Sequence, residues 1–243
     1  MNNPIQTIDG SNTLFSNKYN QHFHDLKTGA IKESLNKHVI PAITLKKDAK
    51  VLRILDICFG IGYNTFSTIY YILENNLDIS VEIYSPELDE ELVRSLGEFK
   101  FPKEFEKIKH IIDSIAKKLS YEDEKIKIKV FIGDAREYIK TLSNIDIVYQ
   151  DAFSSDVNKE LWSVEYFKDI YKLCKSDALM TTYSISTNVR LSMYEAGFFI
   201  YEINPSGNRK QTIALKSQKT IDAKYIDMEL KKSRNKEAQA FYD

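Results

Sequence analysis

Acids and glycines follow four apolar runs of the chain, and these residue types at these places suit the binding of a nucleoside. They are Asp56 with Gly60 and Gly62, then Glu87, then Gly133-Asp134-Ala135, and finally Asp151. A carboxylate can accept hydrogen bonds from both hydroxyls of a ribose, and a glycine turn after a strand lets the backbone approach a ligand closely. A single acid at a strand end is more often a helix cap or a turn residue, so the prediction depends on the four places together.

The elements that must position these residues are predicted to alternate between strands and helices from Val51 onward. Strands are expected at 51–57, 80–85, 128–132, 145–149, 178–183, 198–203 and 211–216, and helices at 63–73, 90–96, 105–118, 135–142, 164–174 and 187–196. This alternation predicts an α/β fold with a mostly parallel sheet and helices on both faces. The last two strands leave no room for a helix, so one of them should run antiparallel. Seven strands with this ending resemble the Rossmann-like sheet of class I methyltransferases rather than a six-stranded dinucleotide-binding sheet.

The four places are predicted to bind different parts of one ligand. Ligands of an open α/β sheet bind at the carboxyl ends of its strands. Glu87 suits a ribose, Asp134-Ala135 suits adenine, and the turn with Gly60 and Gly62 suits the methionine part of S-adenosylmethionine. The chain has no Gly-Lys-Ser/Thr sequence typical of a triphosphate loop. Thr65 stands where the dinucleotide fingerprint has its third glycine, which argues against NAD.

Two terminal segments are predicted to flank this domain. Residues 1–50 form an N-terminal extension with a small hairpin around 13–16 and a helix over 28–39 that Pro41 ends. Residues 51–220 form the main domain, and residues 221–243 form a charged helix or tail. His22 and His24 would face the same side of an extended segment, but no third ligand is near them, so no metal site is predicted. No function is assigned to the lysine-rich and acidic insertion at 97–129.

Composition excludes few functions. The chain has 243 residues, a net charge of −1 and a pI near 6.5, so a nucleic-acid partner would need a local basic face. Its two cysteines, Cys58 and Cys174, lack the spacing of a metal or redox pair. No apolar run reaches membrane-spanning length, and the N-terminus lacks a signal-peptide core. A cytoplasmic protein without membrane contacts is expected.

Several sequence blocks, in order, resemble the methyltransferase domain of the MnmC family. The blocks are Asp9-Gly10-Ser11-Asn12-Thr13, Gly60-Ile61-Gly62-Tyr63-Asn64, Gly133-Asp134-Ala135-Arg136-Glu137, Gln150-Asp151-Ala152-Phe153-Ser154 with Asn158-Lys159-Glu160-Leu161-Trp162, and Gly207-Asn208-Arg209-Lys210. The resemblance spans nearly all of residues 9–216. The Asp-x-Phe…Asn-x-x-x-Trp block is its most specific part, whereas a Gly-x-Gly turn alone is a weak signal.

The resemblance implies a tRNA methyltransferase that uses S-adenosyl-L-methionine. Its reaction would methylate the aminomethyl group of 5-aminomethyl-(2-thio)uridine at the tRNA wobble position. Asp151 would be the catalytic residue. The resemblance implies cofactor contacts from Gly60, Gly62, Asn64, Glu87, Asp134, Ala135 and Asp151. It implies substrate contacts from Phe153, Trp162, Arg190, Arg209 and Lys210, the last three to phosphate. Fused family members also carry an FAD-dependent oxidase domain, for which this chain has no room, so a separate oxidase could act in the same pathway.

Departures from the family pattern leave alternatives open. The usual Asp-Gly-Phe-Ala-Pro is Asp151-Ala152-Phe153-Ser154-Ser155 here, and Cys58 stands where many methyltransferases have their first glycine. One alternative is aminopropyl transfer, as in spermidine synthases, which normally have a fuller glycine run. Another is a non-catalytic binding module on a methyltransferase fold. Keeping Glu87, Asp134 and Asp151 together argues against the second alternative, because a scaffold needs none of them.

Overall fold

The computed structural model describes residues 3–204 and 209–243. The chain divides into two compact units, residues 1–135 and 136–243, which are described in turn. The predicted division at residues 50 and 220 stays a prediction. All seven predicted strands are confirmed, although several begin or end a few residues from the predicted position. The large sheet also has a short strand at each edge that was not predicted.

The first unit begins with two small hairpins instead of the single predicted one. Strand β1 (Ile5–Gln6) pairs antiparallel with β2 (Asn12–Thr13), and β3 (Phe15–Ser16) pairs antiparallel with β4 (Gln21–His22). The Asp9 carboxylate joins this segment to the next helix, because it accepts hydrogen bonds from Ser11 N–H at 3.0 Å and Lys32 N–H at 3.1 Å.

The predicted end of the first helix at Pro41 is wrong. Helix α1 (Ala30–Ser34) continues through a π turn (Leu35–Val39) into α2 (Ile40–Leu45). A proline lacks the N–H of the i→i−4 pattern and its ring clashes with the carbonyl four residues earlier. The π turn already interrupts that pattern, since Ile40 N–H bonds to Leu35 C=O, and the helix therefore passes Pro41 without ending.

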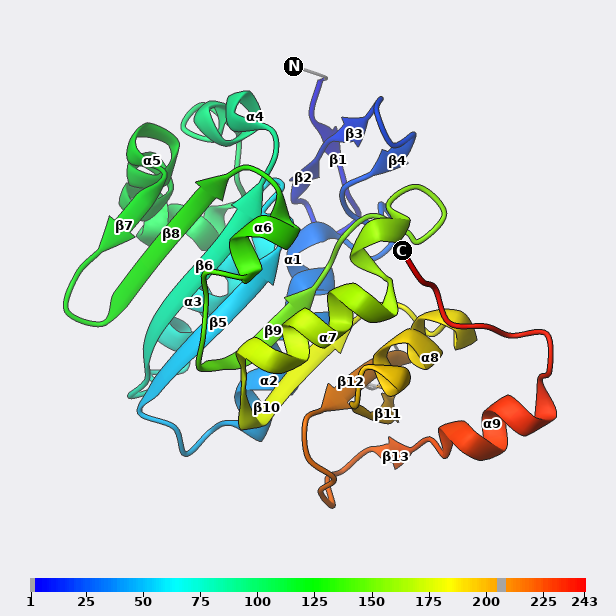
Figure 1. The fold of residues 1–243 in the computed structure, drawn as a ribbon. Coiled ribbons are helices and arrows are strands. Elements are labelled where there is room, and N and C mark those ends of the chain that lie inside the picture. The colour runs from blue at the N-terminus through cyan, green and yellow to red at the C-terminus, as the bar shows by residue number, and fades with distance from the viewer. Residues whose placement is uncertain (1–2, 205–208) are drawn as a thin grey trace. The chain divides into compact units, whose positions relative to one another are not determined.

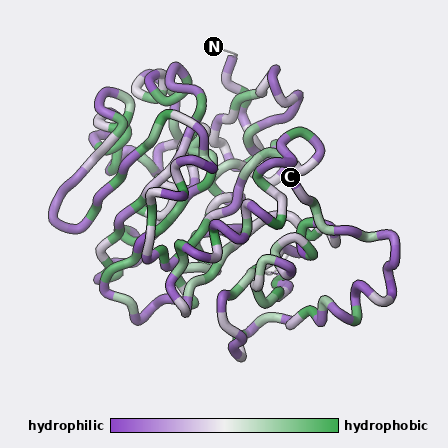
Figure 2. Tube along the Cα trace, viewed as in Figure 1, coloured by the Kyte–Doolittle hydropathy of each residue, from purple (hydrophilic) through white to green (hydrophobic). Residues whose placement is uncertain are grey.

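The sheet of the first unit has the strand order β5-β6-β8-β7. Strands β5 (Val51–Ile57), β6 (Ser80–Glu87) and β8 (Ile126–Ile132) are parallel, and β7 (Ser120–Glu122) runs antiparallel at the edge. The helices are α3 (Tyr63–Glu74), α4 (Glu90–Ser95), a 3-10 turn (Lys103–Ile108) and α5 (Lys109–Lys118). Figure 1 shows α5 beside β7, and Figure 2 shows the hydrophilic turn between β7 and β8.

The insertion at 97–129 is therefore part of the fold. One face of α5 buries Ile111, Ile112 and Ile115, while its lysines remain exposed. Phe105 in the preceding turn is 1% exposed and packs its ring against Tyr63 and Phe66 of α3. These ring contacts of Phe105 hold α3, and with it the glycine turn that begins α3, in place.

The second unit contains the strands in the order β13-β11-β12-β10-β9. Strand β9 (Ile145–Gln150) is buried along its whole length and pairs parallel with β10 (Cys174–Thr182). Strand β12 (Gln211–Leu215) runs antiparallel to both β10 and β11 (Phe199–Ile203), as predicted for the final pair, and β13 (Lys224–Tyr225) lies at the edge.

The helices of the second unit are shorter than predicted at several ends. They are α6 (Ala135–Ile139), a 3-10 turn (Lys159–Leu161), α7 (Val164–Leu173), α8 (Thr187–Glu195) and α9 (Met228–Arg234). Helix α8 lies between α7 and α9 (Figure 1). No helix among the described residues is long and apolar enough to cross a membrane.

Candidate cofactor and substrate site

The glycine turn connects β5 to α3 through three residues in the left-handed region. Their φ angles are +65° for Cys58, +54° for Gly60 and +80° for Gly62. Gly62 is the N-cap of α3, and a Cβ there would lie 2.5 Å from a ring carbon of Phe66, so only glycine fits. Cys58 adopts the conformation that favours glycine, which explains why related turns carry glycine at this position.

Glu87 at the end of β6 is hydrogen-bonded directly to this turn. Its Oε2 accepts from Gly60 N–H at 2.8 Å, while Oε1 accepts from Leu88 N–H at 2.7 Å and Asp89 N–H at 3.0 Å. Burial raises the pKa of the Glu87 carboxyl, and the three backbone N–H groups offset only part of this effect. Each carboxylate oxygen can accept two hydrogen bonds, so Oε2 keeps capacity for a ribose hydroxyl. The glycine turn and this half-buried acid fit the predicted cofactor.

The end of β8 joins the same cluster through the backbone. Gly133 N–H donates to Glu87 C=O at 2.8 Å. Asp134 is exposed and Ala135 is half-buried directly after it, at the start of α6. The first unit therefore brings together three of the four predicted places, at one end of its parallel strands.

Asp56 and Asn64 have structural partners in this cluster. The Asp56 side chain is 1% exposed and accepts hydrogen bonds from Thr65 Oγ1 at 2.7 Å and Asn64 Nδ2 at 3.4 Å. These bonds fix the first turn of α3 against β5. The cofactor contact predicted for Asn64 stays a prediction.

Phe23 is a residue of this region that the sequence did not reveal. A Cβ at Gly60 would lie 3.1 Å from Phe23 Cδ1 and 3.2 Å from Cε1, so the ring lies directly on the turn. The neighbouring His24 is buried, with Nδ1 3.2 Å from Thr13 Oγ1 and its ring 4.8 Å from that of Tyr63. Residues 23 and 24 form a bend after β4, so they show no strand periodicity that could have placed them.

In the second unit, Asp151 is half-buried directly after β9, on a loop fixed by internal hydrogen bonds. Trp162 Nε1–H donates to Phe153 C=O at 2.8 Å, and Tyr183 O–H donates to Ala152 C=O at 2.9 Å. Gln150 Nε2 donates to Leu161 C=O at 2.8 Å. These bonds hold the predicted substrate block in one conformation.

Trp162 is a core residue, which is a correction to its predicted substrate contact. Its ring is 1% exposed and packs edge-on against Phe167 and Tyr183, so it offers no open face. Phe153 is half-buried and is the more accessible aromatic residue of the block. Its predicted substrate contact stays a prediction.

Arg190 is buried, which is a correction to its predicted role as a phosphate contact. The side chain is 2% exposed, Nη1 and Nη2 each lie 3.1 Å from Glu202 Oε2, and Nε donates to Thr212 Oγ1 at 2.9 Å. A guanidinium engaged in this way is not available to a phosphate on the surface. Lys210 is exposed and pairs with Glu202 Oε1 at 2.9 Å, and Arg209 is exposed. Gly207 and Asn208 of the same block lie outside the described residues.

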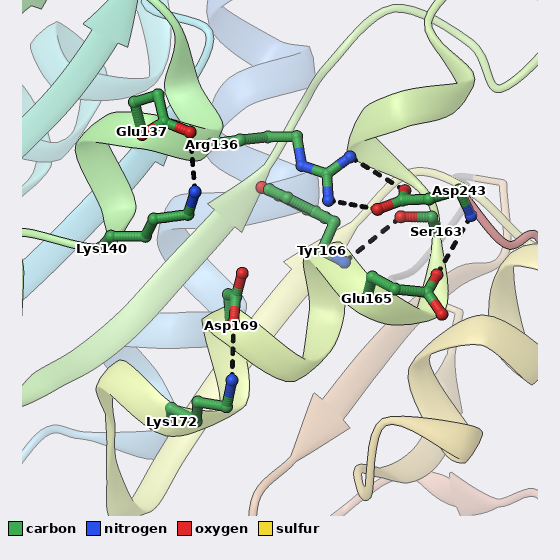
Figure 3. Close-up of polar contacts among 9 residues, drawn as sticks. All are labelled: Arg136, Glu137, Lys140, Ser163, Glu165, Tyr166, Asp169, Lys172 and Asp243. Carbon is green, nitrogen blue, oxygen red and sulfur yellow. Dashed lines mark hydrogen bonds and ion pairs between the residues drawn. The ribbon is translucent and has the colours of Figure 1, made fainter.

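The last described residues contact the helices beside the substrate block. Arg136 of α6 donates two hydrogen bonds to the Asp243 carboxylate, at 2.9 and 2.5 Å, and Asp243 N–H donates to Glu165 Oε2 at 3.1 Å (Figure 3). Val164 N–H at the start of α7 donates to Phe241 C=O at 2.8 Å. No pattern in the sequence indicates these contacts, because they join residues more than 70 positions apart.

Comparisons with known proteins identify the family of the chain. Residues 102–218 match the family described as S-adenosyl-L-methionine-dependent methyltransferase. The crystal structure of MNMC2 from Aquifex aeolicus shares 34% identity and a TM-score of 0.80, over 97% of this chain and 75% of that one. This likeness confirms the predicted α/β methyltransferase fold.

Two relatives extend the comparison. An uncharacterized protein, MJ0670 of Methanocaldococcus jannaschii, is 31% identical over 87% of this chain and 58% of its own length. The tRNA 5-methylaminomethyl-2-thiouridine biosynthesis bifunctional protein MnmC of Campylobacter fetus is 27% identical over 80% of this chain and 33% of its own. The chain thus spans about a third to three fifths of these relatives. It belongs to the S-adenosyl-L-methionine-dependent methyltransferases related to MnmC.

Proposed function

We propose that the chain methylates the aminomethyl group of 5-aminomethyl-(2-thio)uridine at the tRNA wobble position. The observation that carries the proposal is the likeness to MNMC2 over 97% of the chain, at 34% identity. Relatives named for the biosynthesis of 5-methylaminomethyl-2-thiouridine in tRNA support the same substrate. A tRNA substrate also favours a cytoplasmic location.

The proposed roles of the residues follow from their chemistry. S-adenosyl-L-methionine, when bound, supplies an electrophilic methyl group on a sulfonium. Glu87 accepts hydrogen bonds from the ribose, and the turn at Gly60 and Gly62 binds the methionine part. Asp151 accepts a hydrogen bond from the neutral substrate amine and orients its lone pair. As the new C–N bond forms and the C–S bond breaks, the amine loses a proton, which Asp151 takes as a general base.

The rigidity of the Asp151 loop supports this role. The hydrogen bonds of Trp162 and Tyr183 hold the two carbonyls that follow Asp151, at Ala152 and Phe153. A base on a loop that already has one conformation loses little conformational entropy when the substrate binds. In this proposal Trp162 acts by positioning the loop, and Phe153 supplies the aromatic contact to the nucleoside.

The test uses purified protein and tRNA that carries 5-aminomethyl-2-thiouridine. Nucleoside mass spectrometry should show a mass gain of one methyl group on that nucleoside with wild-type protein. Asp151→Asn should abolish methyl transfer while S-adenosylmethionine binding, measured by calorimetry, changes little. Unchanged turnover in this variant would remove Asp151 from the mechanism. Turnover of decarboxylated S-adenosylmethionine with putrescine instead would favour the aminopropyltransferase alternative.

The bifunctional relatives suggest one further partner. The chain spans 33% of the length of the Campylobacter fetus protein, so that relative contains a large additional part. We propose that a separate FAD-dependent oxidase acts in the same pathway and supplies the aminomethyl substrate. Deleting the gene for this chain should then make 5-aminomethyl-uridine species accumulate in cellular tRNA. An unchanged nucleoside profile would contradict both this and the proposed substrate.

A further inference from the structure

The covalent order of S-adenosylmethionine limits where its positive charge can lie. The sulfonium connects the ribose to the methionine chain. Glu87 is the proposed ribose acceptor and the glycine turn is the proposed methionine site, and Gly60 N–H donates to Glu87 Oε2 at 2.8 Å. The two sites therefore meet at Gly60. A cofactor bound to both must carry its sulfonium beside this residue.

Phe23 is the side chain that lies against Gly60. The ring carbons Cδ1 and Cε1 lie 3.1 and 3.2 Å from the position of a Cβ on Gly60, closer than ordinary side-chain contacts. Phe23 N–H donates to Leu14 C=O at 3.0 Å, which holds the residue to the neighbouring hairpin. Tyr63, the first residue of α3, donates its O–H to Asn12 C=O at 2.8 Å and so ties the same segment to the turn.

We infer that Phe23 recognises the positive charge of the methyl donor and thereby distinguishes S-adenosylmethionine from its product, S-adenosylhomocysteine. The face of an aromatic ring attracts a cation, whereas the thioether of the product is neutral. The two molecules differ only in the methyl group on sulfur and in the positive charge that it brings. The N-terminal extension thus supplies a specificity-determining residue to a cofactor site that the rest of the first unit builds. This inference rests on the proposed methyltransferase function.

The experiment compares the dissociation constants of S-adenosylmethionine and S-adenosylhomocysteine by calorimetry. Phe23→Leu keeps an apolar side chain and removes the ring. It should weaken S-adenosylmethionine by about two- to fivefold more than S-adenosylhomocysteine, as expected for a cation beside a partly exposed ring. Phe23→Tyr keeps the ring and should leave the ratio of the two constants unchanged.

Phe131 provides a matched control in the same unit. Its ring also lies against a glycine of the cluster, since a Cβ at Gly133 would be 2.6 Å from Phe131 Cε1. Gly133 adjoins the proposed adenine site, and both molecules carry the same adenine. Phe131→Leu should therefore leave the ratio of the two constants unchanged, whatever it does to each.

The outcomes separate this inference from the proposed function. If the wild-type protein binds both molecules and Phe23→Leu leaves their ratio unchanged, the charge is recognised elsewhere and the inference is wrong. If the wild-type protein binds neither, the proposed cofactor site is wrong. Should Phe23→Leu fail to fold, a fluorinated phenylalanine at position 23 weakens the ring's attraction for a cation at nearly constant shape. The same shift in the ratio is expected there, and its absence overturns the inference.

Discussion

Replacing Arg190 by methionine tests whether this residue stabilises the fold or binds tRNA. The guanidinium is 2% exposed and the carboxylate of Glu202 13% exposed, and three nitrogens of Arg190 are hydrogen-bonded to Glu202 and Thr212. Removing one partner of a buried ion pair leaves the other charge poorly compensated, which costs about 3–5 kcal/mol. Arg190→Met should therefore lower the free energy of unfolding by about that amount in urea denaturation. This would be a large part of the total stability of a typical domain.

The loss of stability in Arg190→Met should depend on pH, because Glu202 is the titratable partner of Arg190. Burial alone would raise the pKa of this carboxyl, but hydrogen bonds from Lys210 and Arg190, and their charges, lower it below the ordinary value of 4.5. A depressed pKa means that the contribution is complete above pH 4.5 and is lost as the pH falls through the folded-state value. The difference in stability between wild type and Arg190→Met should accordingly shrink below pH 4.5.

Lys210 offers the control for this prediction, because it pairs with the same carboxylate from the surface. Its side chain is 56% exposed, and surface ion pairs contribute about 0–1 kcal/mol. Lys210→Met should therefore cost less than about 1 kcal/mol. If Arg190→Met also costs less than about 1 kcal/mol and instead weakens tRNA binding, the buried pair does not form in solution and the phosphate contact predicted from the sequence is right.

Two further predictions concern the glycine turn and the C-terminal residues. Cys58→Gly should raise the free energy of unfolding by up to about 1 kcal/mol, because the relief of left-handed strain exceeds the added chain entropy; a loss of stability would refute the strain. The hydrogen bond from Arg136 holds the pKa of Asp243 below 3.8. Asp243→Asn should lower the free energy of unfolding by less than about 1 kcal/mol near neutral pH, and it should have no effect once acid has protonated the carboxyl. A double-mutant cycle with Arg136→Gln that shows zero coupling energy would contradict this ion pair.

The strands could be predicted from the sequence because their burial leaves a direct pattern. Strand β9 is buried at every residue and appears in the sequence as a short apolar run that only Asp146 interrupts and that ends at Gln150. The two N-terminal hairpins have strands of two residues, too short for any period to be visible. Pro41 was misread because a π turn depends on hydrogen bonding that composition does not reveal.

The candidate site could be predicted where topology alone decides it. Parallel strands bring their carboxyl ends to one edge, so the proximity of Gly60, Glu87 and Gly133 followed from the order of the elements. The roles of Arg190 and Trp162 did not follow, because a charge or a ring in the sequence does not indicate its partner. Arg190 finds Thr212 and Glu202 only when α8 packs on the strands β11 and β12.

The glycine turn shows why a Gly-x-Gly sequence is a weak signal and a contact is a strong one. Three residues of the turn need the left-handed conformation, yet only two of them are glycine, since Cys58 tolerates φ +65°. Conformation alone therefore does not decide where glycine must stand. Space decides at Gly62, where a Cβ would lie 2.5 Å from the ring of Phe66. At Gly60 a Cβ would lie 3.1 Å from the ring of Phe23, a tight contact that adds to the left-handed φ of +54°. The ring of Phe23 belongs to the N-terminal extension. The preference for glycine at position 60 therefore depends partly on a segment that the strand and helix patterns do not assign to the methyltransferase domain.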